Sequence, residues 1–382
     1  MLARRACSFL EAVYDPDLAL FPYTTRVVEG RYVSDFYHAS AIRYSINCLL
    51  ALRTANEREP GAHSFATRGD ELVADFLDRN EASVRNIGDK GLLLALLAGR
   101  DGMEGDAAER AFARVCELFD DNRHEALVLQ DICWLLWGAV ARESAGDERA
   151  APIAHGLFHT LVSKFLSRGS VFPRHSLARH RRGTVSFGGL AYFLKALHEY
   201  ASWAGDEHGE TLFRDAVSRV VATQGLAGEW PWFFDARTGL PVDLYPVYSV
   251  HQDSMAMLFL LPALDRGVPG VSEAIKRSYA WILGGNQLGV SMIRSDPFLR
   301  YRSLERRGPF QRPRRYGRSL LALHDRGERL AGRAEHVQLN RECRSYEMGW
   351  VIYAWAGRSE LLSLTPDERA VTFPGVPKSS SS

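Results

Sequence analysis

The chain has 382 residues, of which 46% are hydrophobic and 24% charged, and its 47 Lys and Arg nearly balance its 46 Asp and Glu, for a formal charge of +1. A chain of this length and composition can bury a large core, so wholesale disorder is excluded. The balanced charge argues against a dedicated nucleic-acid-binding protein, whose basic face usually shows in the total.

The sequence also bears on the compartment. No apolar stretch reaches the length of a membrane-spanning helix. The N-terminal segment lacks the apolar core of a signal peptide, because Glu11 and Asp15 interrupt it. The five cysteines lie far apart without a Cys-x-x-Cys pair, which is typical of buried thiols in a reducing compartment. We therefore expect a cytoplasmic protein without a membrane span, and the oligomeric state stays open.

Apolar residues recur with helical periodicity along almost the whole chain, whereas the alternation typical of strands is nearly absent. Short loops containing Gly, Asp or Asn separate the periodic segments. The predicted helices cover residues 38–56, 66–79, 91–98, 107–119, 123–142, 150–167, 185–204, 209–224, 250–264, 271–283 and 345–363.

Several of these helices are apolar on more than one face, as expected for an inner ring of helices shielded by an outer ring. No repeat of 34 or 40 residues recurs, which disfavours an open solenoid. The sequence therefore predicts an all-α (α/α)6 toroid over residues 38–365, with an N-terminal extension, 1–37, packed on it and a flexible tail, 366–382. Two long irregular segments, 225–248 and 284–340, remain inside the toroid, and loops of that length are usually functional or disordered.

The most informative segment runs from Gly228 to Met255. Trp230 and Trp232 stand in a loop where polar residues would be expected, and aromatic faces there suit a ring-shaped ligand. The residues His251, Gln252 and Asp253 follow at the start of a buried helix, where they could point into a central cavity. The alternative interpretation is structural, with Asp253 capping the helix and the aromatic residues in the core.

This segment resembles one found in a bacterial group of poorly characterised toroid proteins associated with polysaccharide genes. The resemblance lies in a Gly-x-Trp-x-Trp loop, 228–232, followed by Tyr-Pro-x-Tyr-Ser-x-His-Gln, 245–252, and it extends over about residues 127–363. The Gly-x-Trp loop is also distantly similar to the helical domain of glucuronyl C5-epimerases, and six-hairpin glycosidases and polysaccharide lyases share the general architecture. The resemblance implies a toroid fold and does not assign a reaction.

Chemistry on a uronic-acid sugar needs an acid, a base and a cation for the carboxylate. The predicted catalytic residues are His251, with Asp253 or Glu229 as its carboxyl partner, and Tyr248 as a phenol donor. Arginine suits the carboxylate because its guanidinium fork matches the two oxygens. Two arginine-rich loops suggest an anionic ligand, although they could also be solvated basic loops. The predicted substrate-binding residues are Trp230, Trp232, Tyr245, Gln252, Asp131, Arg294 and Arg302.

A second acidic pattern points to different chemistry. Asp120, Asp121 and Glu125 form an Asp-Asp-x-x-x-Glu cluster of the kind that holds Mg²⁺ in class I terpene synthases. The same stretch reads as a capping box, because Asn122 and Glu125 precede an apolar helix by the right spacing, and this interpretation is favoured. We therefore expect no cofactor, with Mg²⁺ as the requirement under the alternative.

The sequence as a whole favours a carbohydrate-active enzyme, a hydrolase, lyase or epimerase, acting on an anionic, uronic-acid-containing glycan. The first alternative is an isoprenoid cyclase with a dry aromatic cavity in the same scaffold. The second is a non-catalytic binding scaffold, which would have side chains filling the centre of the ring.

Overall fold

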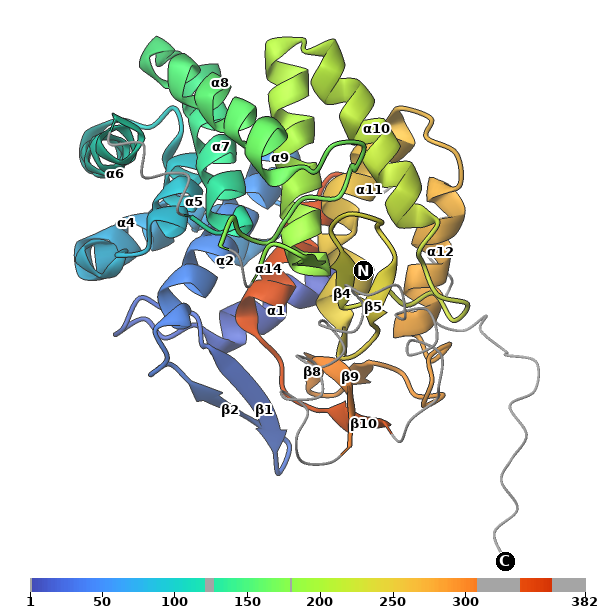
Figure 1. Cartoon of the computed structure of the whole chain (residues 1–382). Coiled ribbons are helices and arrows are strands. Elements are labelled where there is room, and N and C mark those ends of the chain that lie inside the picture. The colour runs from blue at the N-terminus through green and yellow to red at the C-terminus, as the bar shows by residue number, and fades with distance from the viewer. Residues whose placement is uncertain (1, 121–126, 179–180, 308–336, 359–382) are drawn as a thin grey trace, which may run out of the picture.

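The computed structural model describes residues 2–120, 127–178, 181–307 and 337–358, and helices form two concentric layers in it (Figure 1). Six helical segments of these residues pack side by side into a closed inner ring, in which each contacts the next and the last contacts the first. In ring order they are α2 (Ser40–Arg58), α5 (Ile87–Leu97), α7 (Leu129–Ser144), α9 (Phe187–Ala204), the π-helical turn η5 (His251–Met255) with α11 (Met257–Asp265), and α14 (Ser345–Trp355).

The outer layer supplies one partner to each inner helix. These helices are amphipathic, with alternating buried and exposed faces, as expected for a layer that has solvent on one side. The partners, in the order of the inner ring, are α4 (Gly69–Asn80), α6 (Gly102–Asp120), α8 (Ala151–Thr160), α10 (Glu207–Val221), α12 (Val271–Ile282) and α1 (Leu2–Val13). The short helix α3 (Ser64–Thr67), the single turns η1 (Glu81–Ser83) and η3 (Glu148–Ala150), and the π-helical turn η4 (Leu161–Phe165) lie in the connections.

The predicted (α/α)6 toroid is therefore confirmed, and the predicted helices match observed ones to within a few residues at most ends. Three starts differ more. Two predicted helices begin too late, at residue 91 instead of Ile87 and at 107 instead of Gly102, and one begins too early, at 123 instead of Leu129. Helix α1 was not predicted. It packs against α14 and so pairs the first helix of the chain with the last. The proposed domain boundaries, at residues 37 and 365, stay predictions.

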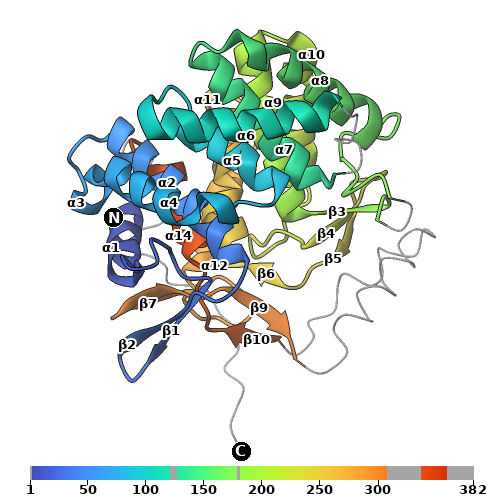
Figure 2. The same cartoon turned by 90° about the vertical axis from the view of Figure 1, so that its left-hand side faces the viewer.

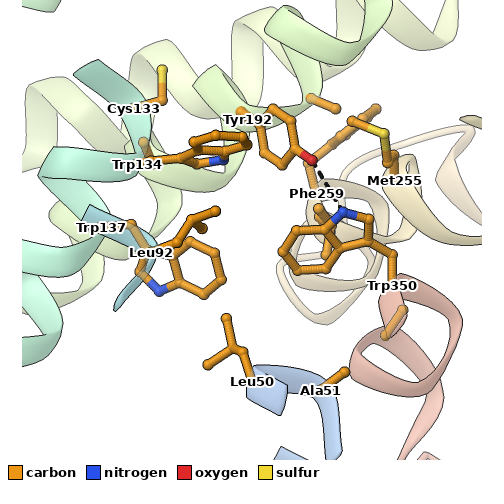
Figure 3. Packing of buried hydrophobic residues seen from close by; sticks show 14 of the residues in the cluster. Leu50, Ala51, Leu92, Cys133, Trp134, Trp137, Tyr192, Met255, Phe259 and Trp350 are labelled. Carbon is orange, nitrogen blue, oxygen red and sulfur yellow. Dashed lines mark hydrogen bonds between the residues drawn. The ribbon is translucent and has the colours of Figure 1, made fainter. Parts of the chain in front are cut away.

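Large aromatic side chains fill the middle of the ring (Figure 3). Trp134 and Trp137 come from α7, Tyr192 from α9 and Trp350 from α14, and each is at least nine-tenths buried. The Trp350 Nε1 donates a 3.0 Å hydrogen bond to the Tyr192 hydroxyl, and the Trp134 and Tyr192 rings meet edge to face at 5.0 Å. Side chains in the centre of the ring are what the binding-scaffold alternative predicts, so an enzymatic site in this toroid has to lie toward one of its ends.

Short strands gather at one end of the ring of helices (Figures 1 and 2). They form antiparallel sheets in the orders β1-β2, β3-β4-β5, β10-β9-β6 and β7-β8. The strands are β1 (Thr24–Val28), β2 (Arg31–Asp35), β3 (Thr184–Ser186), β4 (Phe233–Asp235), β5 (Pro241–Asp243), β6 (Val247–Tyr248), β7 (Ile293–Ser295), β8 (Phe298–Arg300), β9 (Ser303–Arg306) and β10 (Val337–Asn340).

Most of these strands fall within the two segments that the sequence predicts to be irregular. They are only two to five residues long, too short for alternation to stand out in the sequence. Strands β2, β3, β6 and β10 lead into the inner helices α2, α9, η5 and α14, so the strand-bearing end is where inner helices begin. Among the described residues, no helix is both long and apolar enough to cross a membrane.

Candidate active site

Titratable and aromatic side chains converge where the inner helices begin. They come from the first turns of these helices, and contacts between neighbouring first turns place them at one end of the ring. The residues are Arg43 and Tyr44 on α2, Asp89 on α5, Asp131 on α7, His251 on η5, and Tyr346 and Glu347 on α14. We call this region the N-terminal end of the ring.

Three glycines let α5 and α7 approach each other closely. A Cβ added at Gly88 would lie 2.4 Å from the Asp131 Oδ1 atom, and one added at Gly91 would lie 2.6 Å from the Trp134 carbonyl oxygen. A Cβ at Gly138 would lie 2.3 Å from the Gly91 carbonyl oxygen. Only glycine fits at such separations, and the close approach brings the carboxyl group of Asp131 next to the first turn of α5, which carries Asp89.

Asp89 is held as the partner of an arginine. The Arg43 Nε donates a 2.5 Å hydrogen bond to the Asp89 Oδ1, while the Asp89 backbone N–H is capped by the Asn86 side chain at 3.1 Å. The Arg43 guanidinium also lies over the Trp134 ring, 4.9 Å from its centroid. Burial raises the pKa of the Asp89 carboxyl, and the charge of Arg43 opposes that rise.

Asp131 lies in a different environment from Asp89. It is half-buried, and burial raises the pKa of its carboxyl to about 6, with Asp89 adding to the rise and Arg43 opposing it. One of these two carboxyl groups is therefore ion-paired directly, while the other can hold a proton near pH 6. Two neighbouring carboxyl groups whose environments give them different pKa values can serve as the acid and the base of a reaction.

A cluster of aromatic side chains borders the same end of the ring. The Trp232 and His251 rings stack at 5.5 Å, and Tyr248 contacts both, at 4.9 Å and 5.2 Å respectively. A Cβ at Gly188 would lie 3.9 Å from the His251 Nε2, which places the start of α9 beside the imidazole. Trp232 and Tyr248 are partly exposed, so this cluster offers aromatic edges or faces to a ligand.

The His251 imidazole itself is only 3% exposed. Burial lowers its pKa to about 3, so the ring is neutral across the physiological range. Its Nδ1 atom is buried and has no hydrogen-bond partner among the described residues. The structure thus confirms a helix beginning at His251 and brings His251, Trp232 and Tyr248 together, while the catalytic role of His251 stays a prediction.

Asp253, the predicted partner of His251, belongs to a buried ion cluster. The Arg300 Nη1 donates a hydrogen bond to the Asp253 Oδ1, and the Arg300 Nη2 lies 3.7 Å from the Glu347 Oε2. All three side chains are 0% exposed. The Asp253 carbonyl accepts hydrogen bonds from the Tyr279 hydroxyl and the Trp355 Nε1, so the residue is fixed on both its side chain and its backbone.

The remaining predicted residues are distributed over the core and the loops. Trp230 is fully buried, stacks on Phe187 at 5.4 Å and donates a 3.0 Å hydrogen bond to the Ser278 hydroxyl. The side chain of Glu229 is buried against Gly225, and a Cβ there would lie 2.3 Å from its carboxyl carbon.

Three further predicted residues are held by their own segments. Tyr245 lies under the Arg306 guanidinium, which is 5.0 Å from its ring centroid. The Gln252 Nε2 donates to the Tyr248 carbonyl oxygen, and the Arg294 Nε donates to the Asp296 carbonyl oxygen within the β7-β8 hairpin. None of these contacts brings the three residues to Asp89 or Asp131, and their proposed roles stay predictions.

The acidic pattern of the cyclase alternative lies almost entirely outside the described residues. Asp120 is the exposed last residue of α6 in the outer layer, whereas Asp121 and Glu125 fall in the undescribed segment 121–126. Within the described ranges, no group of three or more His, Cys, Asp or Glu side chains is arranged to hold a metal ion.

A pocket of about 410 Å³ opens on the outer face of the molecule, between α10 and the turn after β4. Its polar lining includes Asp215, Arg219 and Thr238. Asp89 and Asp131 lie on inner helices, away from this pocket. We choose the N-terminal end of the ring as the candidate active site because of the paired carboxyl groups there, and not because of pocket volume.

Sequence reasoning missed Asp89. The prediction starts the helix at residue 91, so Asp89 counts as a loop residue, although Asn86 and Asp89 have the spacing of a helix cap. Glycines at 88 and 91 in an apolar segment were the signal that two helices approach closely there. Asp131, in contrast, was predicted from its place in an apolar helix.

No protein-family model matches the chain, and a search among curated proteins gives no match. Solved structures, however, match nearly its whole length. One is an α-1,6-mannanase of Salegentibacter sp. HEL1_6, with 12% identity, a TM-score of 0.60 and coverage of 94% of this chain and 98% of that chain.

Two further matches have the same fold. The unsaturated glucuronyl hydrolase of Bacillus sp. GL1 has 15% identity, a TM-score of 0.56 and coverage of 94% and 95% of the two chains. The cellobiose 2-epimerase of Bacillus thermoamylovorans B4167 has 13% identity, a TM-score of 0.62 and coverage of 84% and 95%. At these identities the likeness establishes the toroid fold and confirms, at that level, the resemblance to toroid proteins.

Proposed function

We propose that this chain is a carbohydrate-active enzyme that hydrolyses a glycan at the N-terminal end of the ring. The observation that carries the proposal is the pairing of Asp89 and Asp131, two neighbouring carboxyl groups in different electrostatic environments. Asp131, whose pKa is raised to about 6, is the group that can donate a proton. Asp89, held by Arg43, is the group that can accept one.

The two groups together complete a glycoside hydrolysis. The Asp131 carboxyl gives its proton to the leaving glycosidic oxygen as the bond from that oxygen to the anomeric carbon breaks. The Asp89 carboxylate takes a proton from the water whose oxygen forms the new bond to the anomeric carbon. Trp232 and Tyr248 offer aromatic surface against which a sugar ring can pack.

The proteins of similar fold support this class of reaction. An inactive variant of the Salegentibacter mannanase carries asparagine in place of two consecutive aspartates, which agrees with a role for aspartate in a toroid of this kind. The Bacillus glucuronyl hydrolase is described as responsible for the degradation of glycosaminoglycan, an acidic polysaccharide. Together with the Arg302 guanidinium over Tyr248, this favours an anionic, uronic-acid-containing glycan as the substrate.

The test is turnover on a panel of acidic and neutral oligosaccharides, followed as newly formed reducing ends. Asp131→Asn and Asp89→Asn should each lower kcat/KM by about 10²- to 10⁴-fold, the usual contribution of a general acid or base. Asp106→Asn, which removes an exposed carboxyl on the outer helix α6, is the matched control and should leave turnover unchanged. If Asp131→Asn keeps its turnover, Asp131 is not the general acid.

Epimerisation is the second candidate, and the neutral His251 imidazole stacked on Trp232 favours it. An epimerase acting through proton transfer at carbon would incorporate deuterium from heavy water into the sugar without breaking a glycosidic bond. If the wild type incorporates deuterium without forming new reducing ends, and His251→Asn does not incorporate it, the protein is an epimerase and not a hydrolase.

A further inference from the structure

A single carboxylate, that of Glu342, is shared by three guanidinium groups beside the candidate active site. The Arg344 Nη2 donates to its Oε2 at 2.9 Å and the Arg302 Nη1 lies 3.3 Å from the same oxygen. The Arg26 Nη2 donates to the other oxygen, Oε1. Three positive groups around one carboxylate leave this locality with positive charge to spare, a setting that attracts a second carboxylate.

Of the three arginines, Arg302 is the one that faces the aromatic cluster. Its guanidinium carbon lies 5.3 Å from the centroid of the Tyr248 ring. The Glu347 carboxyl and the Tyr44 and Tyr346 rings, which meet at 4.4 Å, also lie close to it. Arg26, in contrast, is 62% exposed on the β1-β2 hairpin, and Arg344 is held by the Tyr23 carbonyl oxygen and lies over the Tyr23 ring.

Arg302 also has an unused donor and a fixed backbone. Its Nε atom is buried and has no hydrogen-bond partner within the described residues, while the side chain as a whole is 20% exposed. Its carbonyl oxygen accepts a 2.8 Å hydrogen bond from the Ser249 N–H, and its own N–H donates to the Asn340 carbonyl oxygen at 3.1 Å. A backbone fixed on both sides holds the base of this side chain beside Tyr248, while the guanidinium can still turn.

Tyr44 connects Arg302 to the catalytic carboxyl groups. It follows Arg43 directly on α2, so one residue of the pair lies toward Asp89 and the next toward Tyr346. A sugar ring that reaches Asp131 and packs against Tyr248 would therefore have the Arg302 guanidinium within the reach of its substituents.

We propose that Arg302 recognises the carboxylate of an acidic sugar by giving up its contact with Glu342 and binding the substrate carboxylate instead. The inference rests on the proposed function and specifies which residue selects the substrate class. When the substrate binds, the Arg302 guanidinium turns from the Glu342 Oε2 to the sugar carboxylate and can add its Nε as a second donor. Glu342 stays paired with Arg26 and Arg344, so the exchange costs one of its three contacts.

A neutral sugar has no group that can replace Glu342 on Arg302. Only an acidic sugar therefore gains a charge-assisted hydrogen bond from Arg302. We expect acidic sugars to bind about 10- to 100-fold more tightly than neutral ones.

The experiment measures binding in the full-length Asp131→Asn variant, which separates affinity from turnover. The probes are uronic-acid oligosaccharides, such as oligogalacturonides and cellobiouronic acid, and their carboxyl-reduced neutral counterparts, titrated by calorimetry. The starting variant should prefer the acidic member of a pair by about 10- to 100-fold. Arg302→Ala and Arg302→Lys, the second keeping the charge without the fork, should both reduce that preference, the alanine variant almost to unity.

Glu342→Gln provides the opposite change, because it frees Arg302 from its internal partner. It should strengthen binding of the acidic probe by several-fold and leave the neutral probe unaffected. Arg114→Ala, which removes an exposed guanidinium on the outer helix α6, is the matched control for general charge and should change neither affinity.

The outcomes separate this inference from the proposed function. Equal binding of acidic and neutral probes overturns the role of Arg302 and leaves glycan hydrolysis standing. Loss of the preference in Arg294→Ala, with retention in Arg302→Ala, also overturns it. Binding of neither probe class counts against the proposed function itself.

Discussion

Two groups of carboxyl side chains lie at the N-terminal end of the ring, and they differ in how far water reaches them. Asp89 and Asp131 belong to the first turns of α5 and α7, where Asp131 is half-buried and can exchange a proton. Asp253 and Glu347 are 0% exposed and share the guanidinium of Arg300. The same residue types thus occur in two settings: Asp131 is half-buried and Asp89 beside it is 7% exposed, whereas Asp253 and Glu347 are enclosed completely.

The fully enclosed group of Asp253, Glu347 and Arg300 bears on the stability of the fold. Charged groups removed from water are stable only while their partners stay in place. Arg300 bridges β8, η5 and α14, so its ion cluster joins the strand-bearing end to two inner helices. We therefore expect changes in the fully enclosed group to act on stability and changes in Asp89 and Asp131 to act on turnover.

The largest expected effect on stability follows from Arg300→Met. This substitution removes the guanidinium that the buried Asp253 and Glu347 share and should lower the free energy of unfolding by about 3–5 kcal/mol. Urea unfolding followed by circular dichroism measures the change. Arg114→Met, at an exposed arginine of the outer layer, is the control, and an equally small change in both variants would show that the buried cluster is not structural.

A smaller effect is expected from Glu347→Gln, and it depends on pH. Burial raises the pKa of the Glu347 carboxyl from 4.5 to about 7, so between these values the folded protein binds more protons than the unfolded chain. The free energy of unfolding of the wild type must then fall as pH rises through this window, by up to about 3 kcal/mol from this group. The glutamine variant should lose that contribution, so its stability relative to the wild type should rise between pH 4.5 and 7.

Unfolding midpoints of the two proteins at several pH values provide the measurement. A constant difference between the wild type and Glu347→Gln across pH 4.5 to 7 would contradict the raised pKa of this carboxyl.

A third effect concerns Asp89 and Asp131 and appears in the rate. If Asp131 donates the proton, kcat/KM should fall about tenfold for each pH unit above about 6, because the donating form of its carboxyl is lost. The measured quantity is kcat/KM from pH 4 to 9 in the wild type, with Asp106→Asn as a control that should give the same profile. A rate that stays constant from pH 6 to 9 would assign the proton to another group.

Much of the fold could be predicted from the sequence because helix periodicity and turn residues are local signals. The start of the helix at His251 and the apolar character of the inner helices followed from such signals. Helix α1 carries the same local signal, because its buried residues Ala6, Leu10 and Val13 recur at helical spacing, and only its pairing with α14 depends on contacts across the whole sequence.

The candidate site was predictable only in part, for the same reason. The neighbourhood of Trp232, Tyr248 and His251 could be inferred because these residues lie close together in the chain. The pairing of Asp253 with Arg300, 47 residues away, and of Asp89 with Arg43, 46 residues away, depends on how the ring closes. Local patterns therefore led to Asp253 as the catalytic carboxyl, while the geometry favours Asp89 and Asp131.

The most direct test compares kcat/KM for Asp131→Asn and Asp253→Asn on the same glycan under conditions in which both variants are folded. The account predicts a loss of about 10²- to 10⁴-fold for Asp131→Asn, with turnover of Asp253→Asn within about tenfold of the wild type and its stability reduced. Turnover that survives in Asp131→Asn and disappears in folded Asp253→Asn would contradict it and place the chemistry in the buried cluster.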